Sequence, residues 1–154
     1  FEPEQACAFL TTVHTTVGPG GGLIIGVDRK KDSAVLERAY NDAEGVTAEF
    51  NLNLLRHLND KLESDFAPER FQHKAVYNSA LGCVQMFLIS QCDQLVHING
   101  ATVEFAEQEE IHTENSYKYH PDEFRELCAE AGFRVEESWS DDQAYFSLFL
   151  LRAD

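Results

Sequence analysis

The 154-residue chain lacks the features that mark several large classes of protein. No apolar run approaches the roughly 18 residues that a membrane-spanning helix needs, and residues 1–9 carry no basic region typical of a secretory signal. The four cysteines form no CxxC pair, and the six histidines form no HxH, HxxxH or HExxH pattern typical of zinc ligands. We therefore expect a cytoplasmic protein with reduced cysteines, no membrane partner and no dedicated metal site.

Basic residues are scarce. The chain has 12 lysines and arginines against 27 aspartates and glutamates, which gives a formal net charge of -15. Phosphate backbones attract the opposite sign, so this balance argues against a nucleic-acid partner. The only basic cluster, residues 29–31, is flanked by Asp28 and Asp32. With 44% hydrophobic and 11% aromatic residues, the sequence is otherwise of ordinary globular composition and long enough for a sizeable core.

Apolar periodicity and turn residues predict the elements of the first half of the chain. Residues 1–17 form an expected helix, which the glycine-rich segment 18–22 ends. A nucleotide-binding loop follows a strand and opens a helix, whereas this segment follows a helix and opens the strand 23–27, so we interpret it as a tight turn. That strand is apolar throughout, which predicts that both of its faces are covered in a mostly parallel sheet. Two further helices are expected over residues 33–41 and 46–64.

The second half of the chain is expected to be rich in β-structure. The Asn99-Gly100 pair is typical of a type I′ hairpin turn, so we predict that the three strands between residues 82 and 105 form a meander. The final strand is apolar on both faces and should be central in its sheet. The expected strands cover residues 73–77, 82–90, 94–98, 102–105, 133–139 and 145–151, and a helix covers residues 121–131.

Residues 111–119, IHTENSYKY, place Glu114 and Ser116 two positions apart just before a helix start. In an extended chain, residues two apart point to the same side, so a carboxylate and a hydroxyl would converge on one spot. Together they can accept and donate hydrogen bonds, which suits a small ligand that carries N–H groups. An ordinary surface strand explains the segment equally well. Tyr40 is similarly ambiguous, because a tyrosine on the apolar stripe of a helix usually belongs to the core.

The order of elements is similar to the C-terminal half of the Rossmann-like methyltransferases that use S-adenosylmethionine. In those proteins a GPGG-type turn introduces the fifth strand, and a helix with an antiparallel pair of strands ends the chain. Three motifs closely resemble the histidine-specific N-alpha-methyltransferases of ergothioneine biosynthesis: residues 22–59, residues 74–90 (KAVYNSALGCVQMFLIS) and residues 111–119. The resemblance covers essentially the whole chain. It implies an α/β fold with an inserted antiparallel β meander, and S-adenosylmethionine-dependent trimethylation of the α-amino group of histidine to hercynine.

The resemblance also implies roles for four residues. Tyr40 matches a tyrosine that binds the substrate carboxylate, and Met86 matches a pocket residue beside the imidazole ring. Glu114 and Ser116 match the pair that recognises the imidazole. Two alternatives stay open: a methyltransferase for another aromatic amine such as a tryptophan derivative, and a non-catalytic β-rich interaction module whose tyrosines belong to the core.

The sequence also departs from the family pattern. Family members hold S-adenosylmethionine with a glycine-rich loop after their first strand and an acidic residue after their second, and neither matches a segment of this chain. We therefore expect a substrate-binding C-terminal half that is inactive alone. Residues 1–72 and 121–154 would belong to the Rossmann-like domain, and residues 73–120 to a substrate-binding insertion. Strand 23–27 would then have an open edge, which predicts a dimer, a domain swap or pairing with the N-terminal half.

Overall fold

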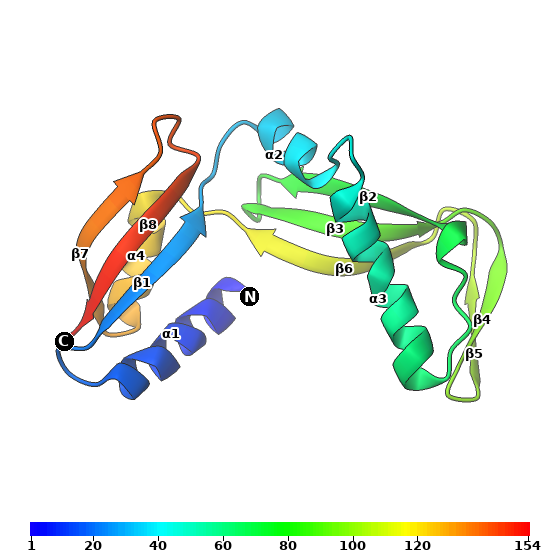
Figure 1. Ribbon diagram of the computed structural model, residues 1–154, viewed down its shortest axis with the longest axis horizontal. Coiled ribbons are helices and arrows are strands. Elements are labelled where there is room, and N and C mark those ends of the chain that lie inside the picture. Colours follow the sequence, from blue (N-terminus) through cyan, green and yellow to red (C-terminus); the bar gives the residue numbers. More distant parts are fainter. The chain divides into compact units, whose positions relative to one another are not determined.

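Contacts between the elements divide the chain into two units. The computed structural model describes all residues from 1 to 154 (Figure 1). Unit 1 contains residues 1–32, 79–83 and 115–154, and unit 2 contains residues 33–78 and 84–114. None of the helices is both long and apolar enough to cross a lipid bilayer.

Unit 1 is built on a three-stranded antiparallel sheet in the order β1-β8-β7. The last strand of the chain lies in the middle, so the prediction that it is central is confirmed. A helix and an antiparallel strand pair end the chain, as the resemblance to Rossmann-like methyltransferases predicts. The elements of unit 1 are α1 (Pro3–Val17), β1 (Gly22–Asp28), α4 (Pro121–Glu130), β7 (Phe133–Ser140) and β8 (Phe146–Ala153).

One face of this sheet is covered and the other is not. Side chains of α1 and α4, among them Leu10 and Phe124, bury the face that carries Phe149. The opposite face stays open, with Ile24 67% and Leu148 43% exposed. The prediction of a two-sided cover in a mostly parallel sheet is therefore wrong for this chain, because β1 pairs antiparallel with β8 and helices pack against one face only.

The glycine-rich segment 18–22 is a tight turn between α1 and β1, as expected. Gly18 and Gly20 adopt φ values of 71° and 73°, which glycine reaches without a steric cost. The Gly20 N–H donates to the carbonyl of Ala153 at 3.0 Å, and the Gly21 N–H donates to the carbonyl of Gly18 at 2.9 Å. The first of these bonds ties the turn to the end of β8, and the second closes the turn itself.

Unit 2 combines two helices with a sheet and a separate hairpin. A three-stranded sheet has the order β2-β3-β6, and β4 and β5 form a separate hairpin. Asn99 and Gly100 form its turn with φ values of 48° and 78°, as predicted. Both β3 and β6 cross the border between the units, because Cys83 of β3 and residues 115–117 of β6 belong to unit 1. The elements are α2 (Ser33–Tyr40), α3 (Val46–Leu62), the 3-10 turn η1 (Pro68–Arg70), β2 (Phe71–Asn78), β3 (Cys83–Ser90), β4 (Gln94–Ile98), β5 (Ala101–Phe105) and β6 (Glu110–Tyr117).

The predicted three-strand meander over residues 82–105 is wrong in its pairing. Strand β3 is flanked on both edges by β2 and β6, so it has no edge left for β4. At its end the chain turns away, and the Ser90 N–H donates to the carbonyl of Glu109, just before β6, at 2.9 Å. The hairpin of β4 and β5 thus extends from the sheet instead of continuing it.

The two helices of unit 2 pack on its strands. Leu55 of α3 lies in one cluster with Phe71, and Leu36 of α2 lies in another with Val84. The units therefore divide the chain differently from the expected domains, which grouped residues 33–72 with the Rossmann-like part. The apolar stripes of both helices bury against β2 and β3, which explains the grouping. The assignment of residues 73–120 as the insertion in a complete protein stays a prediction.

Candidate functional site

Tyr40 and Met86 are brought together by the packing of α2 on β3. Met86 is buried, with 3% of its surface exposed, in a cluster with Leu36 and Val84. Tyr40, at the last position of α2, is partly buried against the same cluster. The two residues thus share one apolar cluster, and their roles toward a substrate remain predictions.

A buried polar network holds the backbone at Tyr40. The Tyr40 carbonyl oxygen lies 2.8 Å from Nε2 of His73, so this nitrogen carries the hydrogen and donates it. The side-chain amide of Asn51, which is 4% exposed, lies 3.0 Å from Nδ1 of His73 and donates to the Phe87 carbonyl at 3.1 Å. Asn51 therefore reaches from α3 to β2 and β3, and His73 continues the chain of hydrogen bonds to the end of α2.

Glu114 lies at a pocket of about 300 Å³ within unit 2. Phe50 and Leu54 of α3 contribute apolar surface, and they are 66% and 40% exposed. Thr113 also lines the pocket, and its hydroxyl donates to the carbonyl oxygen of Met86 at 3.0 Å. An exposed carboxylate beside apolar surface can receive a flat ligand that carries an N–H group.

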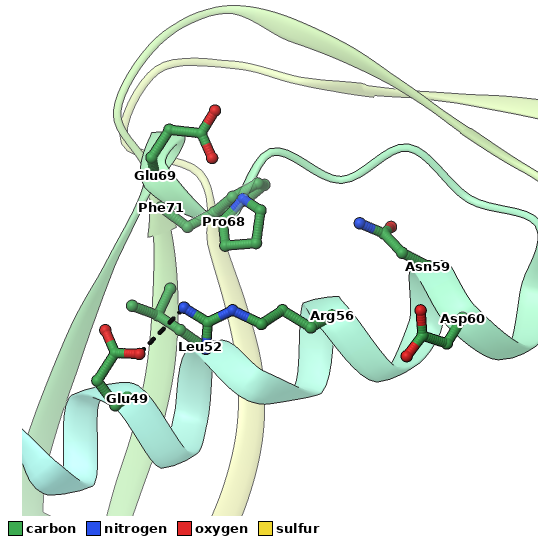
Figure 2. Close-up of a pocket in the computed structure, with 8 residues that line it drawn as sticks. All are labelled: Glu49, Leu52, Arg56, Asn59, Asp60, Pro68, Glu69 and Phe71. Atoms are coloured by element: carbon green, nitrogen blue, oxygen red, sulfur yellow. Dashed lines mark hydrogen bonds and ion pairs between the residues drawn. The ribbon is translucent and has the colours of Figure 1, made fainter.

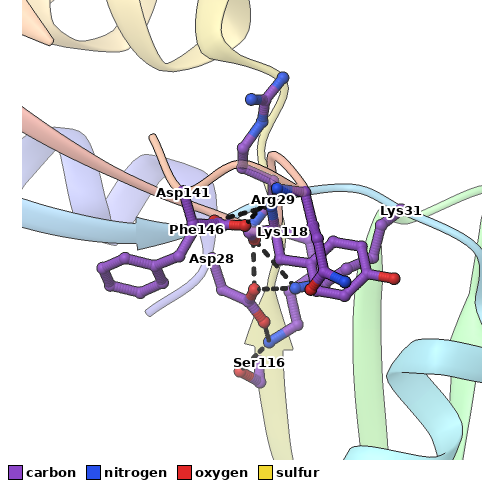
Figure 3. Close-up of polar contacts among 9 residues, drawn as sticks. Asp28, Arg29, Lys31, Ser116, Lys118, Asp141 and Phe146 are labelled. Carbon is purple, nitrogen blue, oxygen red and sulfur yellow. Dashed lines mark hydrogen bonds and ion pairs between the residues drawn. The ribbon is translucent and has the colours of Figure 1, made fainter. Parts of the chain in front are cut away.

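Ser116 follows Glu114 by two positions on β6 but belongs to unit 1. Its Oγ accepts a hydrogen bond from Nζ of Lys118 at 2.9 Å, and the same ammonium lies 3.0 Å from Oδ2 of Asp28 (Figure 3). The structure therefore places Tyr40, Met86 and Glu114 in unit 2, and Ser116 in unit 1.

Asp28, at the carboxyl end of β1, is the centre of the contacts in Figure 3. Its Oδ1 also lies 2.5 Å from Nζ of Lys31. Burial raises the pKa of the Asp28 carboxyl, but the hydrogen bonds and charges of Lys31 and Lys118 outweigh burial and hold the pKa below its ordinary value. Asp28 is therefore an ionised partner for two ammonium groups.

A second pocket, of about 550 Å³, is also in unit 2 and contains none of the four predicted residues (Figure 2). It lies between α3 and the turn η1, with Leu52 and Phe71 among its lining residues. At one end an ion pair joins Arg56 to Glu49 at 3.0 Å. Both partners are largely exposed, so the pair adds little stability and marks no specific ligand.

The comparisons with known proteins decide the family. A family model described as histidine-specific methyltransferase, SAM-dependent, matches residues 1–153. The chain belongs to this family. The histidine N-alpha-methyltransferases of Mycolicibacterium smegmatis and Mycobacterium tuberculosis are each 39% identical to it over 150 residues, which are 96% of this chain and 47% of theirs. This family member thus spans about half the length of the curated relatives it matches.

More distant similarities extend over nearly the whole chain as well. Ergothioneine biosynthesis protein 1 of Neurospora crassa is 31% identical over 151 residues, which are 94% of this chain and 16% of the relative. A solved S-adenosylmethionine-dependent methyltransferase from Clostridium acetobutylicum aligns with a TM-score of 0.48 at 7% identity, covering 99% of this chain and 52% of that one.

The glycine-rich segment 18–22 does not form a cradle for S-adenosylmethionine, on which the family depends by its description. The N–H groups of Gly18, Gly20 and Gly21 donate to the carbonyls of His14, Ala153 and Gly18. Donors used in this way cannot hold a ligand. We therefore assign no cofactor contact and no step on the cofactor to these residues.

Sequence reasoning did not assign a role to Lys118, His73 or Asn51. For Lys118 a signal was present, because it follows Ser116 by two positions in the segment that the sequence predicts to be extended, a spacing that favours a common side. The positions of Asn51 and His73 on separate elements, 22 residues apart in the sequence, carried no such signal.

Proposed function

We propose that this chain supplies the substrate-binding part of an S-adenosylmethionine-dependent N-methyltransferase that converts histidine to its trimethylated betaine, hercynine, in ergothioneine biosynthesis. The observation that carries the proposal is the 39% identity, over 96% of the chain, to proteins named histidine N-alpha-methyltransferase. The names of the relatives refer to proteins about twice as long, so the activity belongs to a complete protein and not to these residues alone.

Tyr40 is the residue that we propose to bind the carboxylate of histidine. A phenolic hydroxyl donates a hydrogen bond to a carboxylate, and such charge-assisted bonds are stronger than neutral ones. The clustering of Tyr40 with buried Met86 supports a fixed position, and the network through His73 holds the backbone at this point. Met86 would then offer its apolar, polarizable side chain to the imidazole ring.

Glu114 and Ser116 are the residues that we propose to recognise the imidazole. A carboxylate accepts from an N–H group, and a hydroxyl can serve the second ring nitrogen. A ligand that lacks these groups leaves the polar side chains unpaired, which costs about 1.5–3 kcal/mol for a hydrogen bond with a charged partner. A site built on hydrogen bonds can reject such an analogue by roughly 10⁴–10⁵.

These residues bind and orient the amino acid. Holding the carboxylate and the ring at the two ends of histidine leaves its α-amino group in a defined position between them. Correct placement of reacting groups can contribute roughly 7–11 kcal/mol to a reaction between two molecules. We assign no proton transfer and no bond change to the four residues.

Calorimetry of the full-length protein with histidine and with tryptophan tests the proposal. We expect binding of histidine, little binding of tryptophan, and a loss of about 1.5–3 kcal/mol of histidine affinity in Glu114→Gln, which keeps the shape but removes the charge. Glu110→Gln, on the same strand and in an exposed pair with Lys74, is the matched control. A preference for tryptophan, or equal histidine affinity in both variants, would refute the assignment.

A second candidate function is methylation of tryptophan or a related amine. The L-tryptophan methyltransferase trpM of Psilocybe serbica is 28% identical over 151 residues, and the exposed Phe50 and Leu54 beside Glu114 would suit a larger ring. The same calorimetry separates the two candidates, because the indole ring has one N–H group and no second nitrogen for the Ser116 hydroxyl.

We also propose that the 154-residue polypeptide associates through β1. This strand lies at the edge of its sheet, and its exposed Ile24 adds apolar surface. We expect association because an open strand edge with unpaired backbone groups tends to pair with another strand. A dimer, a domain swap or pairing with an N-terminal half would each cover the edge. Light scattering of the polypeptide should give more than the monomer mass, whereas a clean monomer without a second polypeptide would contradict this. We place the complete protein in the cytoplasm, where its free cysteines stay reduced.

A further inference from the structure

Two arginines of unit 1, Arg29 and Arg125, carry charges that no carboxylate neutralises. None of the ion pairs in the chain includes either residue. Arg29 directly follows β1, and its guanidinium points away from Asp28 (Figure 3), whereas Arg125 lies on α4. The chain has 27 acidic residues against 12 lysines and arginines, so groups of the opposite sign are not scarce.

Two serines of β7 contact the two guanidinium groups. Nη2 of Arg125 donates to Oγ of Ser138 at 2.8 Å, and Nη1 of Arg29 lies 3.5 Å from Oγ of Ser140. The serines are two positions apart on one strand, so their side chains lie on the same side, about 6–7 Å from each other. Both positive charges are therefore brought to one side of β7.

The neighbouring strand β8 supports this arrangement. In the register of the two strands, Ser138 is opposite Phe149 and Ser140 is opposite Ser147. The guanidinium carbon of Arg125 lies 5.7 Å from the centre of the buried Phe149 ring, a cation–π contact. Oγ of Ser140 lies 2.8 Å from Oγ of the buried Ser147. These contacts locate the two arginines without neutralising them.

Arg29 also has a donor without an acceptor. Its Nε is buried and makes no hydrogen bond, which is unfavourable for a group that carries charge. The Ser140 hydroxyl, at 3.5 Å, is a distant acceptor for Nη1. An anion at the Nη groups would give this guanidinium the strong acceptor that the chain itself does not provide.

The place of the two arginines in the fold suits a ligand. Strands β1 and β7 both run antiparallel to β8, so their carboxyl ends lie at the same edge of the sheet. Arg29 directly follows the first of these ends, and Ser140 is the last residue of the second. Open α/β sheets bind ligands at such an edge. His120 and Pro121, at the start of α4, lie beside Arg29, and the dipole of this helix adds partial positive charge.

We propose that Arg29 and Arg125 form a binding site for a phosphate group, either the free ion or the phosphate of a small molecule. A guanidinium group presents its donors in a rigid fork that matches phosphate oxygens. A phosphate carries nearly two negative charges at neutral pH, which two arginines balance, and its several oxygens can receive both forks. A carboxylate has one charge and two oxygens, so it fits less well.

The charges around the site allow a small anion. The carboxylate of Asp28 contacts Lys31 and Lys118, and that of Asp141 accepts backbone N–H groups of its own turn. The formal net charge of -15 repels a long polyanion such as nucleic acid. A single phosphate responds mainly to charges within the Debye length of about 8 Å, where the arginines lie.

One carboxylate beside Arg125 competes with the proposed ligand. Asp122 precedes Arg125 by three positions on α4, so the two side chains are neighbours on the helix surface. Asp122 is exposed and belongs to none of the ion pairs. Because its charge repels a bound anion, Asp122→Asn should bind phosphate more tightly. This effect is opposite in sign to the loss of an arginine.

Calorimetry of the full-length protein in a buffer without phosphate tests the inference with inorganic phosphate, methyl phosphate and acetate. Arg29→Met and Arg125→Met keep most of the side-chain length and remove the charge. Arg134→Met is the matched control, because Arg134 also belongs to β7 but forms an exposed ion pair with Asp154 at 3.3 Å. Circular dichroism and thermal unfolding verify that each variant is folded.

Arg29→Met and Arg125→Met should each weaken phosphate binding by about tenfold or more, as expected for the loss of a hydrogen bond between charged groups. Arg134→Met should change it by less than about twofold, and Asp122→Asn should strengthen it by about twofold. Acetate should bind about tenfold more weakly than phosphate. Methyl phosphate that binds as well as phosphate supports a site for a phosphorylated small molecule, and binding of phosphate alone supports a site for the free ion.

The inference is overturned if the wild type does not bind phosphate up to about 10 mM, or if acetate binds as tightly. Phosphate binding that persists unchanged in either arginine variant would refute a site formed by both residues. If Arg29→Met does not fold, Arg29→Lys replaces it, because lysine keeps the charge but lacks the fork, and the expected loss is then about threefold.

Discussion

Replacing Asn51 by alanine should destabilise unit 2, because Asn51 is the buried residue through which α3 is hydrogen-bonded to β2 and β3. Its amide donates to the Phe87 carbonyl at 3.1 Å and lies 3.0 Å from Nδ1 of His73. Alanine leaves both acceptors without this donor, and each orphaned buried group costs about 1–3 kcal/mol. We expect a total loss of about 2–4 kcal/mol, with the lower value if water from the adjoining pocket reaches the Phe87 carbonyl.

Hydrogen exchange of the full-length protein, followed by mass spectrometry, measures this loss where it occurs. A loss of about 2 kcal/mol corresponds to roughly 30-fold faster exchange of amides in β2 and β3. Asn53→Ala is the matched control: the residue is exposed on the same helix, so its replacement should change stability by less than about 0.5 kcal/mol. Because His73 donates to the Tyr40 carbonyl, histidine affinity should also fall in Asn51→Ala.

Equal exchange rates in the two variants would refute the argument that the Asn51 hydrogen bonds hold α3 on the strands. Faster exchange in Asn51→Ala without any change in histidine affinity would keep the structural part. It would refute the argument that the network positions Tyr40.

Three further predictions concern single groups. Hydrogen bonds to the Asp42 carboxylate, of which the one from the Thr47 backbone is the strongest, lower its pKa to about 2. An NMR titration should therefore find the midpoint of Asp42 near this value and not at 3.8. The stabilisation of α3 by the ionised carboxylate is complete above pH 3.8 and is lost as the pH falls through about 2. Burial raises the pKa of the Cys128 thiol to about 12, so little reactive thiolate is present at this cysteine. Iodoacetamide should therefore label the partly exposed Cys92 before Cys128, and equal labelling of the two in the folded protein would contradict this. Tyr40→Phe should raise the KM for histidine roughly tenfold with less than about 1 kcal/mol change in stability, and an unchanged KM would refute carboxylate binding by Tyr40.

The elements of the fold follow from local signals, which explains why most of them could be predicted. Positive φ angles occur at three of these turns, and glycine or asparagine adopts such angles more easily than other residues. The turns are the glycine-rich segment, the hairpin turn at Asn99 and Gly100, and the glycine after α4. Strand pairing depends on partners far away in the sequence. The apolar residues of β3 are equally compatible with β4 or β6 as a neighbour, and only the packed sheet decides between them.

Burial is the second property that local patterns do not determine. The apolar residues of β1 predict two covered faces, yet Ile24 is exposed because helices pack on one side only. The same limit applies to the candidate site. The sequence singled out Glu114, Ser116, Tyr40 and Met86 by resemblance, whereas the buried contact between Asn51 and His73 depends on three elements meeting in space.

The segment around β6 shows how a local sequence pattern and a tertiary contact act together. Glu114 and Ser116 of β6 and Lys118 just after its end are spaced two apart, which gives an acceptor, a hydroxyl and a donor in sequence. Lys118 is buried, and its ammonium contacts both the Asp28 carboxylate and the Ser116 hydroxyl oxygen. The chemical meaning of a three-residue pattern thus depends on the tertiary contact that removes one of its members from water.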